Sequence, residues 1–190
     1  LKGQLGGKLA VTGQVDNLSP TAVSAQGDLT FSQGIDLLEQ PFDAKVAWNG
    51  RRLDLIEAKG DSLDAQGKIE IDPSFFSDIP DKLAAIDYFE FEVDRAQDID
   101  ITKLRLTLPS WATKLDYSGK SDFSGQISGI PSAMKIAGNL ALKNFWVEDI
   151  DFEPLLAGNV QISPATGVSL QLKEILTAPL FAPATDLEMD

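Results

Sequence analysis

Cysteine and histidine are both absent from the 190 residues of this chain. Without cysteine no disulfide can brace the fold, so its stability has to come from apolar burial. Without histidine the chain lacks the commonest general base and the commonest transition-metal ligand. No run approaches the roughly 18 apolar residues of a membrane-spanning helix, and Leu1 begins no signal peptide. Because Leu1 is not methionine and Asp190 ends mid-pattern, we interpret the chain as a piece of a longer protein.

Basic residues are also few. The 16 Lys and Arg are scattered among 29 Asp and Glu, which leaves a net charge of −13. Nucleic-acid binding requires a basic stripe, and docking on an anionic membrane requires a basic patch, so the charge argues against both. The 43% apolar and 24% charged content is that of an ordinary folded, soluble domain.

Recognisable catalytic motifs are missing as well. No serine stands in a Gly-x-Ser-x-Gly elbow, and paired carboxylates for glycoside hydrolysis occur in any acidic, strand-rich chain. Acids cluster at residues 94–100 and 148–153, which is one way to bind calcium, but neither stretch has the glycine-containing loop of a calcium motif. Their alternation with apolar residues favours the wet face of a strand. We expect no enzyme activity, no cofactor and no metal site.

Apolar and polar residues alternate with a period of two along most of the chain, as in Leu29-Thr-Phe31 and Phe89-Glu-Phe91-Glu-Val93. This period is typical of half-buried β-strands. Turn residues separate the runs every ten residues or so, which predicts short antiparallel strands, roughly 15 of them.

A repeat with an offset of about 112 residues runs through this pattern. Gly13-Gln-Val returns as Gly125-Gln-Ile, Gly27-Asp-Leu as Gly138-Asn-Leu, and Val46-Ala-Trp as Val160-Gln-Ile. Both copies then reach a hairpin signal, Asn49-Gly50 in the first and the Pro…Gly loop of residues 164–167 in the second. Internal repetition favours an elongated, stacked architecture.

The repeat divides one continuous β-domain into a first copy, residues 1–87, and a second copy, residues 88–173. Residues 174–190 are an end segment or the start of a further unit. One short helix is possible near residues 80–86, with Ser77-Asp78 as its cap and Pro80 in its first turn.

A sheet this wide has to cover or curl its apolar face. Periodicity alone leaves two solutions open, a sandwich whose two sheets fill each other and a single sheet curled around an apolar trough. If the trough is correct, the apolar members of each alternation line its concave face and the acids cover its outside. The candidate lining is Leu29, Phe31, Trp48, Ile69, Ile71, Phe89, Phe91, Val93, Leu104, Leu106, Leu140, Leu142, Val160, Ile162, Leu170 and Leu172.

Four stretches resemble a known family. Three of these are Gly119-Lys-Ser-Asp-Phe-Ser-Gly-Gln-Ile-Ser-Gly129 with Ile136-Ala-Gly-Asn-Leu-Ala-Leu142, and Pro41-Phe-Asp-Ala-Lys-Val-Ala-Trp-Asn-Gly50. With Phe152-Glu-Pro-Leu-Leu-Ala-Gly-Asn-Val160, they are similar to the repeats of TamB and AsmA-like proteins, of the type found in cyanobacteria and in the chloroplast envelope. The individual motifs are loose, and the resemblance rests on their recurring order.

The resemblance implies an elongated, curled antiparallel sheet, a β-taco or half-pipe, whose hydrophobic groove conducts phospholipid or another acyl lipid. It also implies a full-length protein anchored in the inner membrane, crossing the periplasm (the intermembrane space in a plastid) and linked to outer-membrane biogenesis through an Omp85-type barrel. A second hypothesis is a scaffold or chaperone module that pairs its sheet edge with nascent barrel strands by β-augmentation. A third, an adhesin-like sandwich, would leave no cavity.

Overall fold

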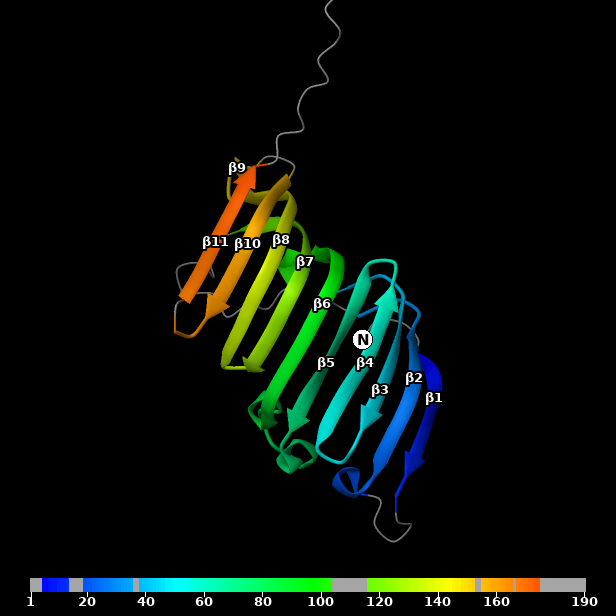
Figure 1. Ribbon diagram of the computed structural model, residues 1–190. Helices are drawn as coiled ribbons and strands as arrows, with labels where there is room; N and C mark the ends of the chain where they lie inside the picture. The colour runs from blue at the N-terminus through cyan, green and yellow to red at the C-terminus, as the bar shows by residue number, and fades with distance from the viewer. Residues whose placement is uncertain are drawn as a thin grey trace, which may run out of the picture.

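The computed structural model describes residues 5–13, 19–35, 38–103, 116–152, 155–165 and 167–174. These residues form an all-β structure with a single sheet (Figure 1). Its strands are β1 (Leu5–Thr12), β2 (Ser24–Phe31), β3 (Phe42–Trp48), β4 (Arg52–Gly60), β5 (Leu63–Ile71), β6 (Ile86–Asp100), β7 (Tyr117–Ile130), β8 (Ala133–Val147), β9 (Ile150–Asp151), β10 (Leu155–Ser163) and β11 (Gly167–Glu174).

The sheet is an antiparallel meander in which strands that follow each other along the chain also lie side by side. Its order is β1-β2-β3-β4-β5-β6-β7-β8-β10-β11, and the two-residue β9 pairs only with β8. The first and last strands of this path do not pair, so the sheet stays open instead of closing into a barrel. The described strands form a curled single sheet, which excludes the two-sheet sandwich for this part of the chain.

Three strands are longer than the sequence pattern indicated. β6 and β8 have 15 residues and β7 has 14. The part of the chain that the structure describes has 11 strands, whereas one strand for every ten residues or so had given roughly 15 for the whole chain. Turn residues inside these strands, such as Gly125 and Gly138, lie in the ladder.

The pairing register divides the side chains between two faces, because directly opposed residues share a face. One row runs from Ala65 through Val93 and Gly125 to Gly138 and Val160. The neighbouring row on the other side of the sheet includes Gln66, Glu92 and Gln126. We call these the apolar face and the polar face.

The apolar face carries the core. Of the buried hydrophobic residues, those that lie in strands are all on this face, and the others lie in the loop after β2 or in short 3-10 turns. The strand members are Phe42, Ala44, Ala58, Ile71, Val93, Ala96, Leu156 and Val160. A side chain on a single sheet becomes buried only when the surface around it is concave or covered, so the sheet curls toward this face.

Bulges maintain the apolar face where strict alternation would have broken it. In β6 the residues opposite Gly125, Phe123 and Ser121 are Val93, Ala96 and Ile99, three apart instead of two. Each extra residue of β6 is accommodated by a bulge, and bulges also increase the local twist and bend of a sheet. Asp98 adopts a φ of 57° within this stretch.

The short helix expected near residues 80–86 is a single 3-10 turn, η3 (Leu83–Ala85). Its N-cap position is Lys82, whose side chain does not cap the turn and instead donates a 2.8 Å hydrogen bond to the Phe75 carbonyl, so the predicted cap at Ser77-Asp78 is wrong. Ser77 instead ends the preceding turn η2 (Pro73–Phe76), which Asp72 caps by accepting a 2.8 Å hydrogen bond from the Ser74 amide. Asp at the N-cap and Pro at the first position both favour a helical turn. A turn therefore begins at Pro73, before the segment that was predicted to be helical.

The repeat has a structural counterpart in two strands of each copy. Gly27 lies opposite Val46, and Gly138 lies opposite Val160, so the second and third strands of each copy share a register. The first strands differ, since Gly138 faces Gly125 whereas Gly27 faces Leu9, four residues before Gly13. The sheet continues from the first copy into the second through β6, which pairs with both β5 and β7.

In the described part of the chain, no helix has the length and apolar character needed to cross a membrane.

Candidate functional site: the apolar face of the sheet

The sixteen residues proposed to line a trough can be located from the pairing register. Fourteen of them lie on the apolar face, from Leu29 on β2 to Leu172 on β11. The other two, Leu104 and Leu106, lie outside the described residues. Contact of these side chains with lipid stays a prediction.

The face is uninterrupted by charge across the middle of the sheet. Between β2 and β10, the described side chains that pair in register with the proposed lining are apolar or glycine, except for Ser121. Ser121 is 2% exposed, and no buried side-chain nitrogen or oxygen in the described part lacks a hydrogen-bond partner. An apolar molecule lying on these described side chains would therefore meet no charged group.

The apolar face extends to both outer strands. Leu5, Leu9 and Val11 of β1 are 55%, 60% and 56% exposed, and Leu170 of β11 is 53% exposed. In the centre the same face is half-buried or buried, as at Phe91 and Val93. Exposed apolar area of this kind on a folded chain marks a contact surface.

Aromatic rings and glycines share this face. Phe31 and Phe42, opposite each other, stack with centroids 4.5 Å apart. Phe91 lies opposite Gly67, where an added Cβ atom would come within 2.3 Å of its ring. Because the inner face of a curled sheet is crowded, a glycine beside a large ring relieves the crowding.

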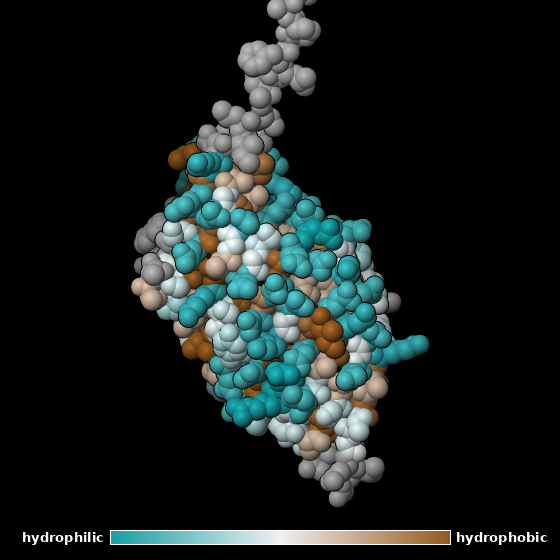
Figure 2. All heavy atoms as spheres, viewed as in Figure 1, coloured by the Kyte–Doolittle hydropathy of each residue, from teal (hydrophilic) through white to brown (hydrophobic). Residues whose placement is uncertain are grey.

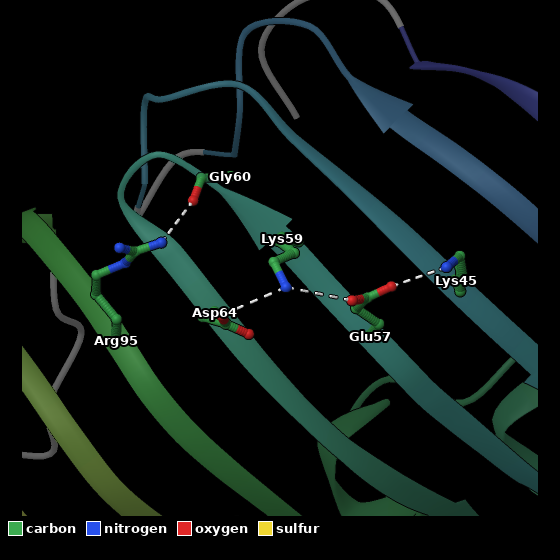
Figure 3. A network of polar contacts seen from close by, with 6 residues as sticks. All are labelled: Lys45, Glu57, Lys59, Gly60, Asp64 and Arg95. Carbon is green, nitrogen blue, oxygen red and sulfur yellow. Dashed lines mark hydrogen bonds and ion pairs between the residues drawn. The ribbon is translucent and has the colours of Figure 1, made fainter.

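The polar face carries charge pairs that cross from strand to strand (Figure 3). Lys45 of β3 contacts Glu57 of β4 at 2.9 Å, and Lys59 lies 3.6 Å from Glu57 and 3.9 Å from Asp64 of β5. Arg95 of β6 donates a 3.1 Å hydrogen bond to the Gly60 carbonyl. The hydrogen bond from Lys45 lowers the pKa of Glu57 below its ordinary value.

Hydrophilic residues dominate the view of this side in Figure 2, in agreement with the pairing register. Each exposed pair contributes little to stability because water and salt screen it. Their combined effect is to keep one side of a wide amphipathic sheet wet and to disfavour aggregation. The polar face therefore defines which side of the sheet is available to an apolar ligand.

Two open depressions also lie mainly over the polar face. One, of about 490 Å³, is bordered by Asp54, Lys68, Glu90 and Glu92, and the other, of about 350 Å³, by Asp122 and Asn139 among others. Lys68 pairs with Glu90 at 3.1 Å, and Glu92 accepts a 2.9 Å hydrogen bond from Gln66. Because these charged groups already satisfy one another, the depressions are weaker candidates for a ligand site than the apolar face.

Asp98 and Glu148, one from each of the acid-rich stretches considered for calcium, have partners within the protein. Lys143 contacts Asp122 at 2.7 Å and Asp98 at 3.2 Å, and these carboxylates raise its pKa, that of Asp122 most strongly. Glu148 accepts a 2.9 Å hydrogen bond from the Asp116 amide. Among the described residues, no three carboxylates gather in an arrangement that could hold a metal ion.

One spacing typical of serine hydrolases does occur. Ser132 and Lys135 stand in a Ser-x-x-Lys arrangement at the turn between β7 and β8, and both are exposed. A nucleophile activated by lysine needs a sheltered site, which an exposed turn does not supply.

Several residues of the apolar face were not anticipated. Leu38, in the loop between β2 and β3, is 5% exposed and packs with Phe42, Ala44 and Ala58. Ile35 of the same loop packs against this cluster. The available signal was a group of apolar residues at positions 35–38, where a connection between strands is normally polar.

The fold and face together define a class: a single-layer, open antiparallel sheet with an apolar concave face and a charged outer face. Comparison of the chain with protein-family models, curated proteins and solved structures gives no match.

Proposed function

We propose that this chain is a segment of a lipid conduit whose apolar face holds acyl chains. The observation that carries the proposal is the uncharged apolar face, which continues from strand to strand across the sheet while the opposite face carries the charge. Exposing an acyl chain to water costs about 0.8 kcal/mol per CH₂ group. A continuous apolar surface removes this cost along its whole length, so no energy source is needed within the segment itself.

The proposed substrate is a phospholipid or a similar acyl lipid. Its acyl chains would lie against the concave face, and its polar headgroup would remain in water at the open side of the curl. Such binding is passive, and it uses no catalytic group or cofactor. It accounts for a face with large aliphatic and aromatic side chains and almost no hydrogen-bonding groups.

The wider setting is proposed from the sequence resemblance. The full-length protein would belong with TamB and AsmA-like proteins, with an anchor in the inner membrane and a β-structure that crosses the periplasm to an Omp85-type barrel. The repeated register of Gly27 with Val46 and of Gly138 with Val160 supports growth of such a structure by addition of similar units.

The second hypothesis, β-augmentation of nascent barrel strands, has its own supporting observation. Among the described strands β1 pairs with β2 alone, and its eight residues are all exposed. An unpaired strand edge is a template for a further strand. This function requires the edge but not the apolar face, whereas lipid conduction requires the apolar face, so substitutions on that face distinguish the two.

The test is extraction of lipid from vesicles of phosphatidylethanolamine and phosphatidylglycerol that contain an NBD-labelled phosphatidylethanolamine. We expect the chain to extract the labelled lipid and Phe91→Asp to reduce extraction at least tenfold, because a carboxylate on the apolar face keeps its water. Gln126→Asp adds the same charge to the polar face of the adjacent strand and should leave extraction unchanged.

Both variants should remain folded, since Phe91 is only half-buried in an open sheet and a carboxylate there can reach solvent. Circular dichroism melting checks this. A folded Phe91→Asp variant that extracts lipid as well as the unsubstituted chain would defeat the conduit. Binding of a barrel-strand peptide that is unaffected by Phe91→Asp, with no lipid extraction, would favour β-augmentation.

A further inference from the structure

The loop between β2 and β3 lies over the apolar face that is proposed to hold lipid. In Figure 1 the loop passes behind β4 and β5, on the side away from the polar face. Leu38 of this loop contacts the cluster formed by Phe42, Ala44 and Ala58, and partly buried Leu55 and Leu63 pack against the same cluster. These contacts place the loop on strands β3 to β5. We call its described residues, 32–35 and 38–41, the strap.

The strap has a defined conformation of its own. Ile35 and Leu38 exchange two backbone hydrogen bonds of 2.8 and 3.1 Å. Gly34 turns the chain with a φ of 68°, and a Cβ atom at this position would lie 2.0 Å from the Leu38 carbonyl oxygen. This geometry directs Leu38 toward the sheet, where its side chain is 5% exposed.

The surface beneath Leu38 is built from small residues. Ala44 lies opposite Ala58, and Ala58 lies opposite Ala65 on the next strand. Ala44 and Ala58 are 3% and 2% exposed. Because alanine side chains are short, this row stands lower than its larger neighbours, and we call it the alanine hollow. Leu38 packs with Ala44 and Ala58 of this row. A hydrocarbon chain is aliphatic, as the leucine side chain is, and it is unbranched and therefore narrower.

A charge pair holds the far side of the strap. Lys103, in the 3-10 turn η4 (Ile101–Lys103) that follows β6, donates a 2.6 Å hydrogen bond to Glu39. The two residues are 64 positions apart. Ile99, at the end of β6, packs against the Leu38 cluster from the same direction. The strap therefore extends from the β2–β3 connection to the end of β6.

We propose that the strap is a gate on the acyl-binding face, in which Leu38 occupies the alanine hollow when lipid is absent and the Glu39–Lys103 pair is its latch. This inference rests on the proposed lipid conduit and adds its regulation. An acyl chain that crosses β3 to β5 displaces Leu38 and takes its place on Ala44 and Ala58. Exchange of one aliphatic group for another keeps the hollow filled, so the face stays covered in both states.

The latch is tested without lipid by the reactivity of a single cysteine. The chain contains no cysteine, so Leu38→Cys introduces one thiol at the centre of the gate. We expect slow labelling by a maleimide, and labelling at least fivefold faster when Lys103→Gln is added. Lys135→Gln, which removes an exposed lysine of β8 remote from the strap, is the matched control and should not change the rate. Equal labelling with and without Lys103→Gln would overturn the latch.

The gate is tested with Glu39→Cys/Lys103→Cys, joined or left open by a short bismaleimide linker. We expect the joined form to extract NBD-labelled phosphatidylethanolamine from the same vesicles at least tenfold more slowly than the open form. Extraction at equal rates would show that lipid does not displace the strap and would overturn the gate while leaving the conduit intact. Extraction by neither form nor by the unsubstituted chain would instead contradict the conduit on which the gate depends.

Discussion

Gly125 of β7 lies directly opposite Gly138 of β8 on the apolar face. A Cβ atom on Gly138 would lie 2.2 Å from the Ser124 carbonyl oxygen and 2.8 Å from the Gly125 Cα atom. On either side of this pair stand two buried valines, Val93 opposite Gly125 and Val160 opposite Gly138. The two glycines let strands β7 and β8 approach where the sheet curls.

Substitution of this pair tests the curl. We expect Gly138→Ala to lower the free energy of unfolding by about 1–3 kcal/mol, because the new methyl group overlaps backbone that cannot move without disturbing the ladder. Gly6→Ala in β1 is the control, since a Cβ atom there meets nothing nearer than 4.0 Å and the substitution should be neutral or slightly stabilising. Urea denaturation measures both. Equal stability of the two variants would contradict close packing at the glycine pair.

The bulged part of β6 depends on Lys143. This residue joins Asp122 of β7 to Asp98 of β6, whose φ is 57°. We expect Lys143→Gln to lower the free energy of unfolding by about 0.5–1 kcal/mol, after allowance for solvent screening of a partly exposed network. Lys135→Gln on the same strand is the control and should have a smaller effect.

The stabilisation that Lys143 contributes should depend on pH, and the sign of this dependence follows from its pKa. The two carboxylates raise the pKa of Lys143 above its ordinary value of 10.5. Its stabilisation is therefore fully present below that value and is lost as the pH rises through the raised pKa. Urea denaturation between pH 7 and pH 11 measures the difference in the free energy of unfolding between the unsubstituted chain and Lys143→Gln. We expect this difference to stay constant at neutral pH and to shrink only at the alkaline end of the range. A difference that changes between pH 7 and pH 9 would contradict this assignment.

The stabilisation that Asp100 contributes has the opposite pH dependence, because it is lost at acid pH. Its carboxylate accepts hydrogen bonds of 3.0 Å from the Thr102 amide and 2.6 Å from the Thr102 hydroxyl, and these lower its pKa below 3.8. The stabilisation is present above that ordinary value and disappears as the pH falls through the lowered pKa. We expect Thr102→Val to raise the Asp100 pKa, as measured by carboxyl ¹³C NMR titration. Thr12→Val in β1 should leave it unchanged, and an unchanged Asp100 pKa in both variants would refute the hydroxyl contribution.

Most of the apolar face follows from alternation alone. Where a strand runs without a bulge, as in β2 and in residues 133–143 of β8, residues two apart share a face, and Leu29 with Phe31 or Leu140 with Leu142 are placed correctly on one side. Alternation fails in β6, where Val93, Ala96 and Ile99 keep to the same face at intervals of three. A bulge depends on the partner strand as well as on local sequence, so it cannot be predicted from the sequence of one strand alone.

The contact between the strap and the end of β6 could not be predicted from the sequence for a different reason. Glu39 and Lys103 are 64 residues apart, and their contact depends on how far the sheet curls between β2 and β6. Curl is a sum of twists, bulges and glycine contacts over several strands, so the local pattern around either residue does not reveal it. The alanines beneath Leu38 are not predicted from the sequence as part of a contact surface, because alanine has a low strand propensity. Their small size is what leaves room for the leucine.

The central claim is that the apolar face contacts acyl chains, and photo-crosslinking tests it most directly. A benzoylphenylalanine placed at Phe91 projects from the apolar face of β6, and one placed at the adjacent Glu92 projects from the polar face. Each variant is produced in cells and irradiated, and the purified protein is analysed by mass spectrometry for covalently attached lipid. The account predicts a phospholipid adduct at position 91 and none at position 92. Adducts at both positions, or at neither, would contradict it.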